Sequence, residues 1–150
     1  PFVWTQAGGV KSLLDIAATC EVLETMGIPV LGWRTDTLPL FYDAHGGPPV
    51  HARVESSDEA ARVAYAHWSL GGGGLVLARP PDTSLDVSDL IEQIIAEARK
   101  KDISGPAVTP FVLGQLHERS HGRTLAANRT LIVANAGLSA EVAQTLAGPG

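Results

Sequence analysis

The amino-acid sequence predicts an α/β fold built on a parallel sheet. An apolar segment at 2–5 is followed by helical periodicity and then by a second apolar segment at 28–33, which is the order of a βαβ unit. Short apolar runs and amphipathic segments alternate along the rest of the 150 residues. Because 45% of the residues are hydrophobic and the length suffices for a core, we expect a single domain over 1–150.

The first half of the chain predicts one helix between two strands. A helix is expected over about 12–26, where apolar residues recur at helical spacing, and Gly27 would end it. The buried strand at 28–33 leads into the polar residues 34–37. Open α/β sheets place their ligands at this end of a strand, although an ordinary Asx turn is an equal alternative for this segment.

Two segments then lead to the second predicted helix. Residues 38–42 are apolar but contain a proline, which favours an extended loop, and 50–54 alternate like an edge strand. Ser56 and Glu59 form a capping box that opens a helix ending near residue 70.

The second half predicts a strand and three helices. Glycines break the chain before a strand at 75–78, and a helix around 90–98 closes on basic residues. Thr109 as N-cap and Pro110 at the first position would start a helix reaching about residue 117. A last amphipathic segment at 125–146 is expected to be interrupted at Gly137, which is a poor helix former.

Composition excludes several classes of partner. The net charge of -5 is spread over interspersed acidic and basic residues, so neither nucleic acid nor an anionic membrane is expected to bind. No stretch approaches the roughly 20 apolar residues of a membrane span, and no signal peptide is visible. The single cysteine, Cys20, falls on the apolar face of the first helix and is expected to be a buried thiol. Because it cannot form an internal disulfide, we expect a reducing, cytoplasmic location.

The stretch 7–15 is the best candidate for chemistry. Ser12 and Asp15 fit a capping box at the start of the predicted helix, so Lys11 lies just before the positive end of its dipole. That field disfavours a cation and, together with burial, favours the neutral amine, which is a nucleophile. Lys11 is therefore a candidate nucleophile. The glycines at 8–9 would offer free N–H groups to an anion.

The alternative for Lys11 is a solvated lysine after a turn. The other two lysines, Lys100 and Lys101, lie where a helix is expected to end and the dipole favours cations, so only Lys11 is at the unfavourable end. A Walker A loop is excluded, because it needs glycine immediately before the lysine and this chain has Val10.

One segment also matches a metal-binding motif. The segment from His117 to His121 matches HExxH, in which two imidazoles share a helix face beside a glutamate base, and Glu141 lies downstream as a conceivable third zinc ligand. Arg119 argues against a zinc hydrolase, because a charge on a buried metal helix is costly unless it is paired. Gly122 follows at once, so the helix is expected to end at the second histidine.

Five segments together are more specific than any single motif. They are AGGVKSLLDI at 7–16, LETMGIPVLGWRTDTLPLFY at 23–42, WSLGGGGLVLARPP at 68–81, VTPFVL at 108–113 and TLAANRTLIVANA at 124–136. In content and order they resemble the C-terminal half of the pseudouridine-5'-phosphate glycosidase family, also called pseudouridylate synthase. Its members typically carry CAGxKSILDI, LETxGVPVxGYGTDxFPAFY, W-x-LG before GGVLVANP, VTPFLL and SLxxNIALVxNNA. The resemblance implies the C-terminal portion of a three-layer α/β/α sandwich with a mixed, largely parallel sheet.

The resemblance also implies a reaction. The family lysine of the AGxKS segment aligns with Lys11. Its amine attacks C1′ of the ribose and opens the sugar to a Schiff-base adduct, the C–C bond to uracil breaks, and hydrolysis releases ribose 5-phosphate. The enzyme is a hydro-lyase and is reversible in vitro. The family asparagine that hydrogen-bonds uracil corresponds to Asn128, with Asn135 as the alternative. Ser12 and Asp36 are further candidates for substrate binding.

The chain departs from the family pattern at several positions. GYGTD becomes 32–36 with Arg34 in place of its second glycine, and the asparagine of VANP becomes Arg79. Both are large additions near a presumed pocket. The cysteine before AG is Ala7, NIAL is 128–131 with two changes, and NNA has lost its first asparagine.

The resemblance implies partners outside this sequence. Family members form homotrimers and are about twice as long, and their acid/base glutamate, second lysine and manganese ligands precede the lysine motif. No manganese ligand is therefore expected within this chain. The chain begins at Pro1 without methionine, and we expect it to be the C-terminal part of a longer domain, inactive or nearly so by itself. The alternative from another class is a truncated, non-catalytic homologue that acts in assembly or regulation.

Overall fold

The computed structural model describes residues 3–7, 16–40, 42–44 and 46–148, the first of these ranges by its backbone. Within them, four strands form one sheet in the order β1-β4-β2-β3, and every strand pair is parallel. An isolated antiparallel bridge joins Thr37 to Pro49 beyond the strands. The strands are β1 (Val3–Ala7), β2 (Val30–Trp33), β3 (Ala52–Val54) and β4 (Leu75–Arg79).

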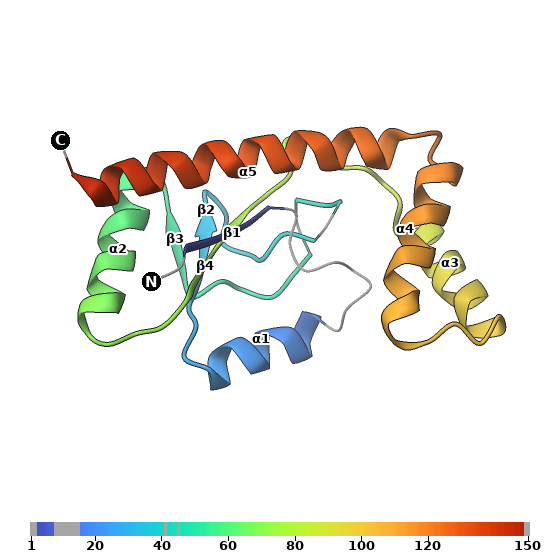
Figure 1. Cartoon of the computed structure of the whole chain (residues 1–150), viewed down its shortest axis with the longest axis horizontal. Coiled ribbons are helices and arrows are strands. Elements are labelled where there is room, and N and C mark those ends of the chain that lie inside the picture. Colours follow the sequence, from blue (N-terminus) through green and yellow to red (C-terminus); the bar gives the residue numbers. More distant parts are fainter. Residues whose placement is uncertain (1–2, 8–15, 41, 45, 149–150) are drawn as a thin grey trace.

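Helices cover both faces of this sheet, so the predicted α/β fold with three layers is confirmed (Figure 1). Two helices pack on one face, α2 and α5, and α1 packs on the other. None of the helices in the described ranges has the length and apolarity needed to cross a bilayer. The helices are α1 (Ile16–Thr25), α2 (Ser57–Ser69), α3 (Ser88–Lys100), α4 (Val108–Arg119) and α5 (Arg123–Ala147), with a 3₁₀ turn η1 (Gly105–Ala107) before α4.

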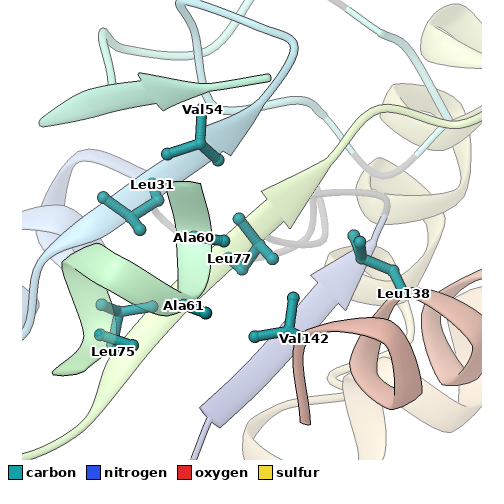
Figure 2. Packing of buried hydrophobic residues seen from close by; sticks show 9 residues of the cluster. Leu31, Val54, Ala60, Ala61, Leu75, Leu77, Leu138 and Val142 are labelled. Carbon is teal, nitrogen blue, oxygen red and sulfur yellow. The ribbon is translucent and has the colours of Figure 1, made fainter. Parts of the chain in front are cut away.

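The largest core lies between the sheet and the α2–α5 layer (Figure 2). Strand side chains alternate between the two faces, so Leu75 and Leu77 of β4 point into this core while Val76 and Ala78 face α1. Helix α2 contributes only small side chains among the fully buried members, which lets it approach the strands closely. The buried members are Leu31, Val54, Ala60, Ala61, Ala64, Leu75, Leu77, Leu138 and Val142. Burying one leucine of this kind contributes about 1.5–3 kcal/mol to folding.

A second core joins α3 and α4 to the loop that holds Tyr42. At its surface, the Arg119 guanidinium donates to both carboxylate oxygens of Glu97, at 2.8 and 2.7 Å. This hydrogen bonding lowers the pKa of Glu97 and raises the pKa of Arg119. The charge of Arg119 is thus paired across two helices.

Several predicted helix ends are confirmed. Gly27 ends α1 with a positive φ of 64°, and the Ile28 amide donates to the Leu23 carbonyl at 2.9 Å. The Ser56 hydroxyl caps α2 by accepting from the Glu59 amide at 3.2 Å. The capping box at Ser12 lies outside the described residues.

Two predicted boundaries are wrong. Helix α4 begins at Val108, with Ala107 as its N-cap, so Thr109 and Pro110 lie inside the first turn. Proline is tolerated there because first-turn N–H groups have no helical partner, and it therefore marks the turn but not the first residue. Helix α5 runs through Gly137 without interruption. Burial of Leu138 and Val142 against the sheet outweighs the ~1 kcal/mol that a helical glycine costs.

A glycine in β2 sets the path of the polar residues that follow the strand. An added Cβ at Gly32 would lie 2.1 Å from the carbonyl oxygen of Thr35. The chain therefore folds back tightly over the end of β2, and only glycine leaves room for it.

We expect Gly32→Ala to lower the free energy of unfolding by about 1–3 kcal/mol, because the new methyl group must displace backbone rather than a flexible side chain. Urea unfolding followed by circular dichroism measures this difference. An unchanged midpoint would contradict the close approach.

Gly137→Ala is the matched control, since the same methyl group meets nothing within 4 Å there. Replacing a helical glycine by alanine should raise the free energy of unfolding by about 0.5–1 kcal/mol. The two substitutions are therefore predicted to shift the urea midpoint in opposite directions.

Candidate active site

The carboxyl edge of the sheet is the place at which a ligand site is expected in this fold. All strands run in the same direction, so their carboxyl ends meet at one edge, where open α/β sheets bind ligands. Ala7, which ends β1, pairs with Arg79, which ends β4. Lys11 follows Ala7 by four residues in the sequence. The positions of Lys11 and Ser12 themselves lie outside the described residues.

Asn128 lies on the inner face of α5 beside Tyr42. Its Nδ2 donates to the Tyr42 hydroxyl at 3.5 Å. Tyr42 is only 5% exposed, and this burial raises the pKa of its phenol, against smaller opposing effects of hydrogen bonds with Asn128 and Thr124. Tyr42 therefore stays protonated at neutral pH, and its hydroxyl fixes the orientation of the Asn128 amide.

Two buried amide oxygens on α5 have no hydrogen-bond partner within the described part of the chain. They are Oδ1 of Asn128 and Oδ1 of Asn135. These residues are seven apart and so lie on the same helix face, with buried Leu131 between them. A buried acceptor without a donor is costly, and a ligand N–H group would satisfy it. This geometry suits both the predicted residue Asn128 and its alternative Asn135.

A pocket of about 310 Å³ lies between the start of α5 and the chain that follows β4. The side chains of Asp82 and Arg123 supply its charged lining. Arg79 is held beside it, because its Nη2 donates to the Asp82 carboxylate. The pocket is lined by Tyr42, Pro81, Asp82, Thr83, Leu85, Arg123, Ala126, Ala127, Thr130 and Leu131.

Asp36 lies near β3, at the opposite edge of the sheet from β1. Its carboxylate pairs with Arg53 of the edge strand β3 at 2.9 Å, and its side chain is 76% exposed. The Thr35 hydroxyl closes the turn by accepting a hydrogen bond from the Thr37 amide at 3.3 Å. In the Asx turn considered for this segment, the Asp36 carboxylate would be the side-chain acceptor instead.

Arg34 also points to the β3 edge. Its Nε donates to the Glu55 carbonyl at 3.1 Å, and its guanidinium lies 5.1 Å from the centre of the Trp33 ring. Its φ of 56° falls in the left-handed region that favours glycine, and the family pattern has glycine at this position. Of the two arginine additions, only Arg79 lies beside the pocket.

The HExxH segment does not form a two-histidine helix face. Helix α4 ends at Arg119, and His121 has a left-handed φ of 52° beyond it. Ser120, between the two, is buried and contacts the Thr124 hydroxyl at 3.0 Å. Across the described residues, no group of three or more His, Cys, Asp or Glu side chains is arranged to hold a metal ion.

Sequence reasoning missed Tyr42 and Asp82 as site residues. Tyr42 stands in an apolar run, and its only signal was that a buried tyrosine hydroxyl usually finds a partner. Asp82 follows two prolines in an unremarkable loop. Cys20 of α1, expected to be buried, is partly exposed, and its partial burial and the nearby Glu24 raise the pKa of its thiol.

Comparison with known proteins finds curated relatives that match most of this chain. Pseudouridine-5'-phosphate glycosidase of Herpetosiphon aurantiacus is 44% identical, over 92% of this chain and 48% of that protein. The enzyme of the same name from Thermus thermophilus is 41% identical, over 95% of this chain and 52% of that protein. The chain thus spans about half the length of these relatives.

Solved structures show the same fold. The prealnumycin C-glycosynthase AlnA, solved with ribulose 5-phosphate, matches with a TM-score of 0.83 and 36% identity, over 93% of this chain and 48% of AlnA. An indigoidine synthase A-like protein of Thermotoga maritima matches with a TM-score of 0.79 and 34% identity, over 94% of this chain and 49% of that protein. The family model of indigoidine synthase A-like proteins matches residues 3–145. This chain therefore belongs to the indigoidine synthase A-like family.

Proposed function

We propose that this chain carries the lysine nucleophile of a pseudouridine-5'-phosphate glycosidase, which reversibly cleaves the C–C bond between uracil and ribose 5-phosphate. The observation that carries the proposal is the place of Lys11 in the chain, four residues after β1 ends beside Arg79 at the ligand-binding edge. The 44% identity to a glycosidase of this name supports it. The ribulose 5-phosphate bound by AlnA supports a phosphorylated pentose as the substrate class.

The proposed reaction proceeds through a covalent adduct on Lys11. The neutral amine attacks C1′, the bond from C1′ to the ring oxygen breaks, and that oxygen takes up a proton. The C–C bond then breaks as the lone pair of the nitrogen forms an imine, and uracil leaves after protonation at C5. Water adds to the imine and releases ribose 5-phosphate and the free lysine.

Asn128 and Tyr42 have distinct roles in this proposal. The free Oδ1 of Asn128 accepts a hydrogen bond from a uracil N–H group, and Tyr42 orients the amide through its contact with Nδ2. Ser12 is proposed to bind the sugar phosphate beside Lys11. Asp36 is proposed to act only indirectly, by holding Arg53 at the β3 edge.

Three further properties rest on the resemblance. We propose that manganese is held by residues other than those of this chain, that the enzyme assembles as a homotrimer, and that it is cytoplasmic. In the proposed steps, solvent supplies the water and the protons, and Lys11 supplies the nucleophilic nitrogen.

We predict that borohydride traps ribose 5-phosphate on Lys11. Reduction turns the imine into a stable amine, so mass spectrometry of a tryptic digest should find the sugar phosphate on the peptide that contains Lys11. Lys11→Ala should abolish this adduct.

Lys100→Ala is the control, because Lys100 lies at the exposed end of α3 and should leave the adduct unchanged. An adduct spread over all three lysines, or none on Lys11, would contradict an activated nucleophile. The non-catalytic role in assembly or regulation would then be favoured.

We also predict that Asn128→Ala weakens the binding of uracil about 3- to 10-fold, the worth of one neutral hydrogen bond. Titration calorimetry in the presence of ribose 5-phosphate measures the affinity. The matched variant Asn135→Ala removes the other free amide oxygen and should have the smaller effect. The reverse order would assign uracil to Asn135, and no effect of either would refute the role of α5 in binding the base.

A further inference from the structure

Arg79 is a charged residue whose side chain is largely buried at the carboxyl edge of the sheet. It ends β4, which lies between β1 and β2 in the sheet, so its side chain starts from the middle of the carboxyl edge. The side chain is only 18% exposed. One terminal nitrogen, Nη2, pairs with Asp82, whereas Nη1 is buried and has no hydrogen-bond partner among the described residues.

An unpaired guanidinium nitrogen in this place needs an acceptor. Nη1 carries two N–H donors and shares the positive charge of the guanidinium, so leaving it buried and unpaired costs more than leaving a neutral group unpaired. Asp82 fixes the plane of the guanidinium through Nη2 and therefore also the direction in which Nη1 donates. The pair therefore holds a buried, charged donor that no group in the described ranges accepts.

The charges around the neighbouring pocket favour an anionic acceptor. Asp82 and Arg123 line this pocket of about 310 Å³, and Arg79 is bonded to Asp82. The two arginines and one aspartate sum to a positive charge. An anionic oxygen would gain charge-assisted hydrogen bonds there, and a neutral ribose or base would gain less.

We propose that Arg79 binds the phosphoryl group of the substrate through Nη1 and so determines specificity for a phosphorylated over a free pentose. This inference rests on the proposed function for the identity of the substrate. Arg79 takes no part in bond breaking. Asp82 is a positioning residue, which holds the guanidinium while the phosphoryl oxygen binds.

The test uses ribitol 5-phosphate, the polyol that corresponds to ribose 5-phosphate. It has no aldehyde and cannot form an imine, so its binding does not depend on the chemistry of Lys11. Calorimetry on the wild-type protein should detect saturable binding, and Arg79→Gln should weaken it about 10- to 100-fold, as expected for losing a charged hydrogen bond. Arg79→Lys keeps the charge but lacks the planar set of guanidinium donors, so its affinity for ribitol 5-phosphate should lie between those of the wild type and Arg79→Gln.

Two controls separate this effect from misfolding and from general charge. Ribitol, which has no phosphoryl group, should bind the wild type and Arg79→Gln alike, and the thermal unfolding of each variant reports its folding. Arg99→Gln removes an exposed arginine from the last turn of α3 and should leave ribitol 5-phosphate binding unchanged.

Three results would overturn the proposal: no binding of ribitol 5-phosphate to the wild type, no effect of Arg79→Gln, or an equal loss for ribitol. The borohydride experiment on Lys11 is independent of this titration. Loss of the lysine adduct with intact Arg79-dependent binding would refute the proposed reaction alone, and the opposite pattern would refute only the role of Arg79.

Discussion

The packing of α5 against the rest of the molecule is the constraint on which the structure depends. This helix of 25 residues, about 37 Å long at 1.5 Å per residue, runs from α4 to α2 across the sheet (Figure 1). Near its C-terminus, Leu138 and Val142 complete the core on the sheet. Near its N-terminus, Asn128 reaches Tyr42, which belongs to the core of α3 and α4. One rigid helix thus fixes both cores relative to the carboxyl edge.

Arg34 and Arg79, the two arginines that depart from the family pattern, show how backbone position determines whether an arginine side chain is exposed or buried. Arg34 follows β2 in a left-handed conformation, which turns its side chain outward onto Trp33 and the edge strand. Arg79 is the last extended residue of a strand that has a neighbour on each side, so its side chain is largely buried at the sheet edge. The exposed contacts of Arg34 contribute little to the free energy of folding. The charge of Arg79 is largely buried and has an unused donor among the described groups, so it favours an anion beside it.

Much of the fold follows from local sequence signals. The Ser56 cap, the Gly27 stop and the strand predicted at 75–78 each depend on a few neighbouring residues, and all three are confirmed. Local rules failed where packing between distant segments decides. Gly137 does not break α5, because its neighbours are buried against the sheet.

The candidate site was less predictable than the fold. The contact between Asn128 and Tyr42 joins residues that are 86 positions apart in the sequence. No local pattern around either residue predicts this contact. The pairing of Ala7 with Arg79 depends on the strand order, which places β4 beside β1 although β2 and β3 come between them in the chain. Family motifs pointed to Lys11 and Asn128 and marked Arg79 as a departure, but they carried no information about the pairing of Arg79 with Asp82.

A crystal structure of the protein after reaction with ribose 5-phosphate and borohydride would test the roles of Lys11 and Arg79 together. We expect continuous density from Nζ of Lys11 to C1 of the sugar at the carboxyl edge of β1 and β4, with the phosphoryl group at Nη1 of Arg79. A sugar phosphate bound elsewhere on the sheet, or attached to another lysine, would contradict this expectation.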